Sequence, residues 1–363
     1  MKKPATKSFG ILTSGGDCPG LNAAIRGVAK ATMGIYDMNV MGICNGYKGL
    51  IEGEVKQLSP EDVSGILTRG GTILGTSREK PFKVTGDADG EVGKNKVEAI
   101  KETYQRFGLD CIVVLGGNGS HKTANLLKDE GLNVVGLPKT IDNDIFGTDV
   151  TFGFYSAVDI ATDAIDRLHS TAHSHNRVMV VEVMGHYAGW LALYAGVAGG
   201  ADVIILPEIP YDIESIKKHI TKRAKGGKAF SIIVVAEGAV SYEESKLSKK
   251  ELKKKMKESS SPSKGYAIAK EIEACTDMDV RVSVLGYQQR GGTPSPYDRV
   301  IATQFGTAAA ELLYKGEFGK MVAKVNNKII TVPLEDVAGK IKLVPKDHRL
   351  IKDARMVGTC FGD

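Results

Sequence analysis

The stretch Cys111-Ile-Val-Val-Leu-Gly-Gly-Asn-Gly-Ser120 joins a short apolar run to a glycine-rich loop, and a helical pattern follows from about Lys122. A β-branched apolar run that ends in glycines and leads into a helix is typical of a buried strand in an α/β protein. Leu12-Thr-Ser-Gly-Gly-Asp-Cys-Pro-Gly20 has the same arrangement, leaving a strand and entering a helix near Leu21. Because ligands of open α/β sheets bind beyond the carboxyl ends of strands, both loops mark a candidate site.

The same alternation of short apolar runs and longer amphipathic stretches continues along the chain and predicts an α/β fold with parallel strands. The predicted strands are Phe9–Thr13, Val40–Ile43, Cys111–Leu115, Val134–Leu137, Val178–Val183, Val203–Leu206, Ile232–Ala236 and Val280–Leu285. At 363 residues the chain is long enough for two domains or one large α/β unit.

Composition narrows the classes of partner. With 48 basic and 43 acidic residues, the net charge of +5 is too dilute to indicate nucleic acid or a membrane surface. The five cysteines contain no CxxC pair, which argues against a disulfide framework and a zinc site. No apolar run approaches the roughly 18 residues of a membrane span, and the N-terminal residues do not resemble a signal peptide. We therefore expect a cytoplasmic protein.

The first glycine loop (Leu12–Gly20) and the second glycine loop (Gly116–Ser120) are suited to binding phosphate. Glycines let backbone N–H groups approach an anion, and the positive end of the following helix adds to the attraction. Neither loop is a Walker A motif, because no Gly-Lys-Ser/Thr closes it. The segment Arg69-Gly-Gly-Thr-Ile-Leu-Gly-Thr-Ser-Arg78 adds guanidinium groups that suit phosphate oxygens. Each loop alone could be a tight turn, but together they predict a polyphosphate ligand.

An acidic segment follows another predicted strand. Pro138-Lys-Thr-Ile-Asp-Asn-Asp144 carries Asp142 and Asp144 two residues apart. In an extended segment, side chains at i and i+2 point the same way, so both carboxylates could face one site. One could accept a substrate proton while the other lies near a metal. The alternative is a turn rich in Asp and Asn with a structural role.

Over roughly residues 8 to 315 the chain closely resembles the 6-phosphofructokinase family. The matching motifs occur in the family's order: Ser14–Asp17, Arg69–Thr72 with Gly75–Arg78, Gly116–Ser120, Thr140–Asp144, Ser174–Arg177, Val181–Gly185, Pro207-Glu208, Ala236-Glu237 and Leu285–Gly292. The resemblance implies two interleaved three-layer α/β lobes with mainly parallel sheets. A donor (ATP) lobe would comprise residues 1–153 and about 289–318, and a fructose 6-phosphate lobe 154–288 and about 319–363.

The resemblance also implies a reaction: transfer of a phosphoryl group from ATP to the C1 hydroxyl of fructose 6-phosphate, the committing step of glycolysis. Asp142 would accept the proton, Thr140 would contact the same sugar, and Asp144 would support the metal and phosphate region. The donor would be held by Gly16, Arg78, Gly117, Asn118, Gly119 and Ser120, with Mg²⁺ bridging its phosphates. The substrate would be bound by Thr140, Asp142, Arg177, Met184, Gly185, His186, Glu237, Arg281, Tyr287 and Arg290.

Two of these arginines carry a further implication. Arg177 and Arg281 would reach the site from a neighbouring subunit, so the resemblance implies a homodimer or homotetramer with shared active sites.

Several positions depart from the family pattern. Asn118 stands where most members carry an Asp that serves magnesium, and it remains the candidate metal residue. Gly119 leaves room for the α-phosphate of ATP, whereas Lys139 matches the pyrophosphate-using relatives. His186 replaces a common Arg, and Tyr287 replaces the His of the short bacterial ATP enzymes.

These departures leave three functions open. The first is an ATP-dependent enzyme, and the second is the same chemistry with pyrophosphate. The third is a non-catalytic regulatory subunit, which is suggested by Asn118 and His186 and opposed by the intact Thr140 and Asp142.

One insert differs in composition from the rest of the chain. Residues 241–264 contain a lysine-rich run followed by serines. A solvated helix and loop is the expected structure, and a basic docking site is the alternative.

Overall fold

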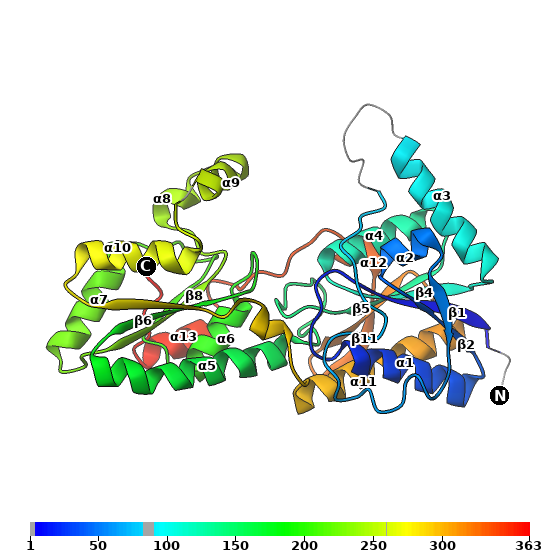
Figure 1. Cartoon of the computed structure of the whole chain (residues 1–363), viewed down its shortest axis with the longest axis horizontal. Helices are drawn as coiled ribbons and strands as arrows, with labels where there is room; N and C mark the ends of the chain where they lie inside the picture. The colour runs from blue at the N-terminus through cyan, green and yellow to red at the C-terminus, as the bar shows by residue number, and fades with distance from the viewer. Residues whose placement is uncertain (1–3, 83–90, 259) are drawn as a thin grey trace. The chain divides into compact units, whose positions relative to one another are not determined.

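The computed structural model describes residues 4–82, 91–258 and 260–363. It contains two compact units, each assembled from separate parts of the chain (Figure 1). The first unit consists of Met1–Ile141, Ile145–Ser156 and Arg290–Ile341. The second consists of Asp142–Asp144, Ala157–Gln289 and Lys342–Asp363. The chain therefore crosses between the units several times, which confirms the expected interleaving.

The first unit is built on a seven-stranded sheet with the order β11-β10-β5-β4-β1-β2-β3. Its strands are β1 (Ser8–Ser14), β2 (Asn39–Ile43), β3 (Val55–Leu58), β4 (Cys111–Gly116), β5 (Val134–Pro138), β10 (Lys320–Val325) and β11 (Lys328–Pro333). The pairs β2–β3 and β10–β11 are antiparallel, and the other pairs are parallel. Every residue of β4 and β5 is buried, because helices cover both faces of the sheet.

Helices cover the two faces of this sheet in separate groups (Figure 1). On one face lie α1 (Leu21–Tyr36) and α11 (Pro296–Lys315), which pack closely on each other. The other face carries α2 (Tyr47–Glu52), α3 (Glu91–Arg106), α4 (Asn118–Asp129) and α12 (Leu334–Val337). Their apolar residues, among them Leu50, Ile100, Leu127 and Leu334, form one core cluster with the sheet.

The second unit contains a four-stranded parallel sheet with the order β7-β8-β6-β9. Its strands are β6 (Val178–Val183), β7 (Val203–Ile205), β8 (Ser231–Ala236) and β9 (Val280–Val284). Its helices are α6 (Trp190–Ala198), α7 (Ile213–Lys225), α8 (Tyr242–Ser245), α9 (Lys249–Glu258), α10 (Lys264–Cys275) and α13 (Arg349–Met356). Most of α5 (Phe154–His175) also belongs to this unit, and a short 3₁₀ helix, η1, spans Gly286–Arg290. Ile216 of α7 and Ile268 of α10 pack on the sheet.

All eight strands predicted from the sequence are confirmed. The strands β3, β10 and β11 were not predicted. β3 has only four residues, β11 has no buried residue, and the apolar run of β10 is only three residues long, Met321–Ala323, with lysines on both sides. The 241–264 insert contains α8 and α9 and ends at the first residue of α10, which agrees with the expected helix and loop. Residue 259 of this insert lies outside the described residues.

The division into units differs from the expected lobes at residues 319–341. These residues were assigned to the second lobe, but β10 pairs in parallel with β5 and so extends the first sheet. The acidic residues 142–144 were expected in the first lobe, but they belong to the second unit.

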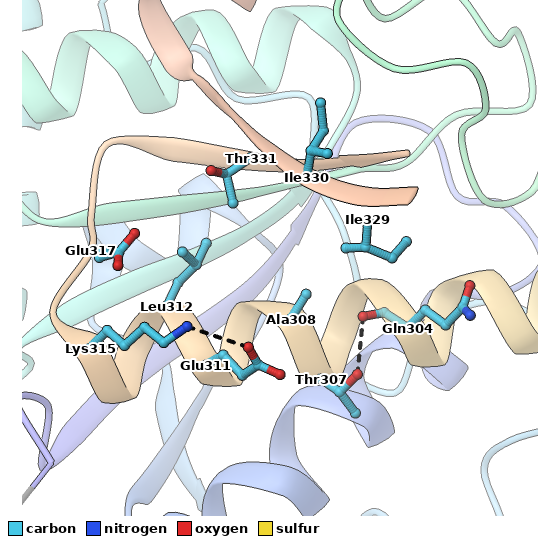
Figure 2. Close-up of a pocket in the computed structure, with 10 residues that line it drawn as sticks. All are labelled: Gln304, Thr307, Ala308, Glu311, Leu312, Lys315, Glu317, Ile329, Ile330 and Thr331. Carbon is cyan, nitrogen blue, oxygen red and sulfur yellow. Dashed lines mark hydrogen bonds and ion pairs between the residues drawn. The ribbon is translucent and has the colours of Figure 1, made fainter. Parts of the chain in front are cut away.

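A groove of about 500 Å³ lies between α11 and the β10–β11 hairpin (Figure 2). It is lined by Gln304, Thr307, Ala308, Glu311, Leu312, Lys315, Glu317, Ile329, Ile330 and Thr331. Within it Lys315 and Glu311 form an ion pair at 3.6 Å along α11. None of the site residues predicted from the sequence lines this groove. Across the parts of the chain that the structure describes, no helix has the length and apolar character needed to cross a membrane.

Candidate active site

The first glycine loop follows β1 and packs against the arginine-containing segment. Gly15 has a φ of 87°, a left-handed conformation that favours glycine. Its N–H donates to the carbonyl of Ser77 at 2.9 Å, and its carbonyl accepts from the Thr76 hydroxyl at 2.7 Å. These bonds bring the exposed Arg78 next to the loop, so the structure places together two elements that the sequence had associated with one ligand.

The second glycine loop ends the neighbouring strand β4. Ser14 and Gly116 are paired residues of β1 and β4, and the Ser120 hydroxyl donates to that of Ser14 at 3.1 Å. A Cβ at Gly116 would lie 2.2 Å from the Cβ of Ser120, so glycine is required there. Gly117 is the N-cap of α4 and no side chain caps it. No capping side chain therefore competes with an anion for the first N–H groups of α4, whereas the N–H of Ser120 already donates to the carbonyl of Gly117 at 3.0 Å.

Lys139 lies between the two glycine loops, just after β5. Its backbone N–H donates to the carbonyl of Gly116 at 3.0 Å, and its Nζ donates to the carbonyl of Gly16. The side chain is 4% exposed. An ammonium group at this depth adds a positive charge at the point where both loops meet.

Arg290 packs against the first glycine loop. A Cβ added at Gly16 would lie 1.5 Å from Nη1 of Arg290, so the absence of a side chain at Gly16 makes room for the guanidinium. The Nε of Arg290 is buried and has no hydrogen-bond partner among the residues described. Buried polar groups are normally paired, and a phosphate oxygen would satisfy this one. Arg290 is predicted to contact the sugar phosphate, which stays a prediction; the structure shows that its guanidinium lies beside the first glycine loop.

Both polar atoms of the Asn118 side-chain amide form hydrogen bonds with backbone groups of residues 339 and 340. Nδ2 donates to the carbonyl of Lys340 at 2.7 Å, and Oδ1 accepts from the N–H of Gly339 at 3.2 Å. The amide oxygen retains one lone pair for a further interaction. Of the described residues, no three or more His, Cys, Asp or Glu side chains gather as a metal site. Because Mg²⁺ commonly keeps its waters and binds through substrate phosphates, this arrangement fits a magnesium ion that arrives with the donor.

The acidic loop (Asp142–Asp144) is a turn and not the extended segment assumed from the sequence. Asn143 has a φ of 52°, which is left-handed, and its side chain is 4% exposed. The argument that an i, i+2 pair points the same way therefore does not apply to Asp142 and Asp144. Lys342, which sequence analysis missed, contacts this loop through both backbone and side chain. It lies 198 residues away from Asp144 in the sequence and outside every motif, so no local pattern marks it.

Within the second unit, the loop after β6 contacts the end of β8. The N–H of His186 donates to Oε1 of Glu237 at 2.8 Å. Burial raises the pKa of Glu237, the hydrogen bond from His186 opposes that rise, and the negative charge of Asp142 adds to it. Gly185 has a φ of 133°, and a Cβ there would lie 2.7 Å from the carbonyl oxygen of Ala188. Position 185 therefore requires glycine, both because its φ is positive and because a side chain would clash with the backbone of Ala188.

Met184 and Tyr287 complete this end of the second unit. The N–H of Met184 donates to Oε1 of the fully buried Gln289 at 3.3 Å. Tyr287 on η1 is 76% exposed, so its phenol is accessible to a ligand. In the first unit, the carbonyl of Thr140 accepts from the Thr151 hydroxyl at 2.7 Å, which fixes the backbone just before the acidic loop.

Arg177 and Arg281 lie together at the opposite end of the second sheet. Both guanidinium groups form ion pairs with Asp279, a residue that was not predicted. Asp279 directly precedes β9 and lies two residues before Arg281 in the sequence, and this short spacing is the only local feature that could have marked it. Arg177 precedes β6, whereas His186 follows it, and the six residues of β6 span roughly 20 Å. One chain therefore does not bring these two arginines to its own His186 and Glu237.

The family model and two relatives that match this chain all carry the name phosphofructokinase. A model of the family described as phosphofructokinase matches residues 8–313. The chain is 67% identical over 364 residues to a protein of Spirochaeta thermophila named ATP-dependent 6-phosphofructokinase, with 100% of both chains covered. It is 52% identical to a protein of Bacteroides thetaiotaomicron named ATP-dependent 6-phosphofructokinase 3, with 98% of this chain and 99% of the other covered.

Solved structures show the same fold. Phosphofructokinase from Saccharomyces cerevisiae is 32% identical with a TM-score of 0.78, covering 91% of this chain and 45% of the yeast chain. A pyrophosphate-dependent phosphofructokinase from Nitrosospira multiformis is 20% identical with a TM-score of 0.81, covering 98% of this chain and 93% of the other, and at that identity it bears on the fold alone. The ordered motifs, the two glycine loops at adjacent strand ends and these matches lead to one conclusion: the chain belongs to the phosphofructokinase family.

Proposed function

We propose that this protein transfers the γ-phosphoryl group of ATP to the C1 hydroxyl of fructose 6-phosphate, giving fructose 1,6-bisphosphate in glycolysis. The observation that carries the proposal is the order of the strand ends in the first sheet. The neighbouring strands β1, β4 and β5 end in two glycine loops and in Lys139, and the acidic loop follows directly. The 67% identical relative named ATP-dependent 6-phosphofructokinase supports the same reaction. A location in the cytoplasm stays a prediction from the sequence.

In the proposed mechanism, the first unit holds the donor phosphates. The first backbone N–H groups of α4, which no capping side chain occupies, would bind the phosphates together with the positive end of that helix. Lys139 and Arg290, which both reach Gly16, supply positive charge where the phosphates would lie. Phosphoryl transfer depends chiefly on such positioning and charge stabilisation. Magnesium supplies further neutralisation of the phosphate charge when the donor brings it.

Asp142 is the proposed proton acceptor for the C1 hydroxyl. In a loose, metaphosphate-like transition state the hydroxyl proton leaves late, so the base needs little basicity and mainly needs correct placement. Thr140 would contact the same sugar, and Asp144 would help to orient the phosphate region. Glu237, held by the N–H of His186, would accept hydrogen bonds from sugar hydroxyls.

The choice of donor depends on Gly119 in this proposal. No described atom lies within 4 Å of the position that a Cβ at Gly119 would take. The start of α4 therefore has space for the α-phosphate of a nucleotide. Lys139 would pair with either donor, so the open space at Gly119 favours ATP over pyrophosphate.

Assays with both donors test the proposal. Formation of fructose 1,6-bisphosphate is measured with magnesium and either ATP or pyrophosphate, for the wild type and for Asp142→Asn. We expect turnover with ATP, and a fall in kcat of about 10²-fold or more in Asp142→Asn with fructose 6-phosphate binding retained. Turnover with pyrophosphate alone would overturn the donor assignment, and no turnover with either donor would favour the regulatory-subunit alternative.

A second pair of variants tests the role of Gly119. Gly119→Asp places a carboxylate beside the α-phosphate and should raise KM for ATP at least about tenfold by charge repulsion. Gly119→Ala adds a methyl group to open space and serves as the matched control, with KM for ATP close to that of the wild type. Equal KM values for all three proteins would refute the assignment.

We also propose that active sites are shared between subunits of a homodimer or homotetramer. The support is the separation of Arg177 and Arg281 from His186 and Glu237 by the length of β6 within one chain. If all four residues serve one sugar phosphate, the arginines must come from another copy.

A further inference from the structure

Lys342 is bonded to two consecutive residues of the acidic loop. Its backbone N–H donates to the carbonyl of Asp144 at 2.8 Å, and its Nζ donates to Oδ1 of Asn143 at 3.0 Å. The residues on both sides, Ile341 and Leu343, are exposed. Lys342 therefore contacts the loop with both its backbone and its side chain.

Trp190 holds Lys342 in place from the other side. The indole N–H donates to the carbonyl of Lys342 at 2.9 Å, and the Lys342 ammonium lies 5.2 Å from the centroid of the indole ring, within cation–π range. Trp190 is the first residue of α6 and is 7% exposed. Two residues beyond Lys342, the N–H of Val344 donates to Oε1 of Glu208 at 2.9 Å. Lys342 is therefore anchored to the start of α6 through Trp190.

The backbone of the acidic loop needs this kind of support. Asn143 has left-handed dihedrals, which Asn adopts more easily than most residues but still at a cost. The bond from Lys342 fixes the Asn143 side chain, and the bond to Asp144 fixes the next peptide. Asp142 precedes this turn directly, so the direction of its carboxylate depends on the turn being held.

We infer that Lys342 is a positioning residue for phosphoryl transfer: it holds the acidic loop in its left-handed turn and thereby orients Asp142. The inference rests on the proposed role of Asp142 as proton acceptor. It adds a residue from the C-terminal segment to a site that the motifs confine to other parts of the chain.

Three variants test the inference by kinetics. Lys342→Met keeps the backbone bond and the chain length but removes the ammonium, and should lower kcat about 10- to 100-fold with KM for ATP within about twofold. Lys342→Arg keeps a charged donor and should recover much of the loss. Lys346→Met removes an exposed lysine of the same segment and should behave as wild type. A Lys342→Met protein with wild-type kcat, or no recovery in Lys342→Arg, would overturn the inference.

A fluorescence readout separates this inference from the proposed function. Trp190 is the only tryptophan in the chain, so its emission reports directly on the Lys342 contact. We expect the acrylamide quenching constant of Lys342→Met to exceed that of wild type and Lys346→Met by about twofold, since the ammonium that lies over the indole ring is removed and no longer holds this segment against it. A wild-type enzyme that does not phosphorylate fructose 6-phosphate would refute the function, and the positioning role with it. An unchanged quenching constant in an active enzyme would refute the Lys342 contact alone.

Discussion

The side chain of Asn118 explains one departure of this chain from its family. Its amide both donates to Lys340 and accepts from Gly339, and a carboxylate cannot donate. An Asp at this position would face the carbonyl oxygen of Lys340 without a proton between them. The amide is therefore accounted for by the contact with residues 339 and 340, independently of any metal.

Asn118→Asp should accordingly destabilise the protein. We expect the free energy of unfolding to fall by about 1 kcal/mol, the usual net contribution of one intramolecular hydrogen bond. Urea denaturation measures the change, with wild type as the reference. An equal or higher stability would show that the Lys340 bond contributes nothing. The magnesium dependence of the same variant tests the metal role separately, since an unchanged dependence would mean that this side chain does not tune the metal.

His121 offers a test of the pH dependence of stability at a single residue. It is fully buried behind the second glycine loop, where its Nδ1 lies 3.0 Å from the carbonyl of Gly117. Burial lowers the pKa of His121 to about 4 from its ordinary value of 6.5, although the hydrogen bond to Gly117 opposes this change. Between these two values the unfolded chain binds the proton and the folded protein does not. Stability is therefore lost as the pH falls from 6.5 toward 4, and His121 has no such effect above pH 6.5.

His121→Gln should remove this contribution. The slope of unfolding free energy against pH between 5 and 6.5 should decrease by up to about 1.4 kcal/mol per pH unit, the value for one proton. Urea denaturation at several pH values gives the slopes of both proteins. Identical slopes would show that His121 is protonated to the same extent in both states.

The helices α1 and α11 make the closest helix contact in the first unit, and glycines permit it. A Cβ at Gly306 would lie 2.7 Å from the backbone nitrogen of Val28 and 2.8 Å from the carbonyl oxygen of Ala24. A Cβ at Gly27 would lie 3.1 Å from the carbonyl oxygen of Thr303. Because these neighbours are backbone atoms, the helices would have to separate to accept a larger residue. α1 directly follows the first glycine loop, so this packing also supports the donor site.

Gly306→Ala should therefore be destabilising although alanine favours helices. We expect a loss of about 1–3 kcal/mol from overpacking. Gly34→Ala is a matched control in α1, because a Cβ there meets no described atom within 4 Å and should be neutral or slightly stabilising. Thermal unfolding of both variants measures the difference. Equal effects of the two substitutions would contradict the close crossing.

At the scale of the whole molecule, the residues predicted to bind the sugar phosphate lie at two opposite ends of the second sheet. Arg177 and Arg281 pair with Asp279 at the amino end of the second sheet, whereas His186 and Glu237 lie at its carboxyl end. In a parallel sheet these two ends cannot meet within one chain. The proposed sharing of active sites between copies would account for this arrangement.

Subunit mixing tests shared sites directly. Asp142→Asn and Arg177→Ala proteins should each be nearly inactive, and a 1:1 mixture refolded together should recover about one quarter of wild-type activity. About half of random pairs are hybrids, and each hybrid has one site built entirely from unmutated residues. The same proteins refolded separately and then combined provide the control. No recovery after joint refolding would show that Asp142 and Arg177 serve the same chain's site.

The local sequence was sufficient to predict the buried strands, the glycine loops and the family. Each of these depends on residues close together in the chain: an apolar run such as Cys111–Leu115 forms a buried strand, and glycines after it allow the turn into a helix. Gly15 and Gly116 illustrate the point, since their conformation and spacing are required by immediate neighbours.

The tertiary structure alone decided which distant residues meet. It placed Arg290 against Gly16, joined β10 to β5, paired Arg177 with Asp279, and brought Lys342 to the acidic loop. It also showed that Asn143 is left-handed, which the i, i+2 argument had not anticipated. Such contacts join residues that are tens to hundreds of positions apart, and their free energy comes from burial and hydrogen bonds that exist only once the chain is folded.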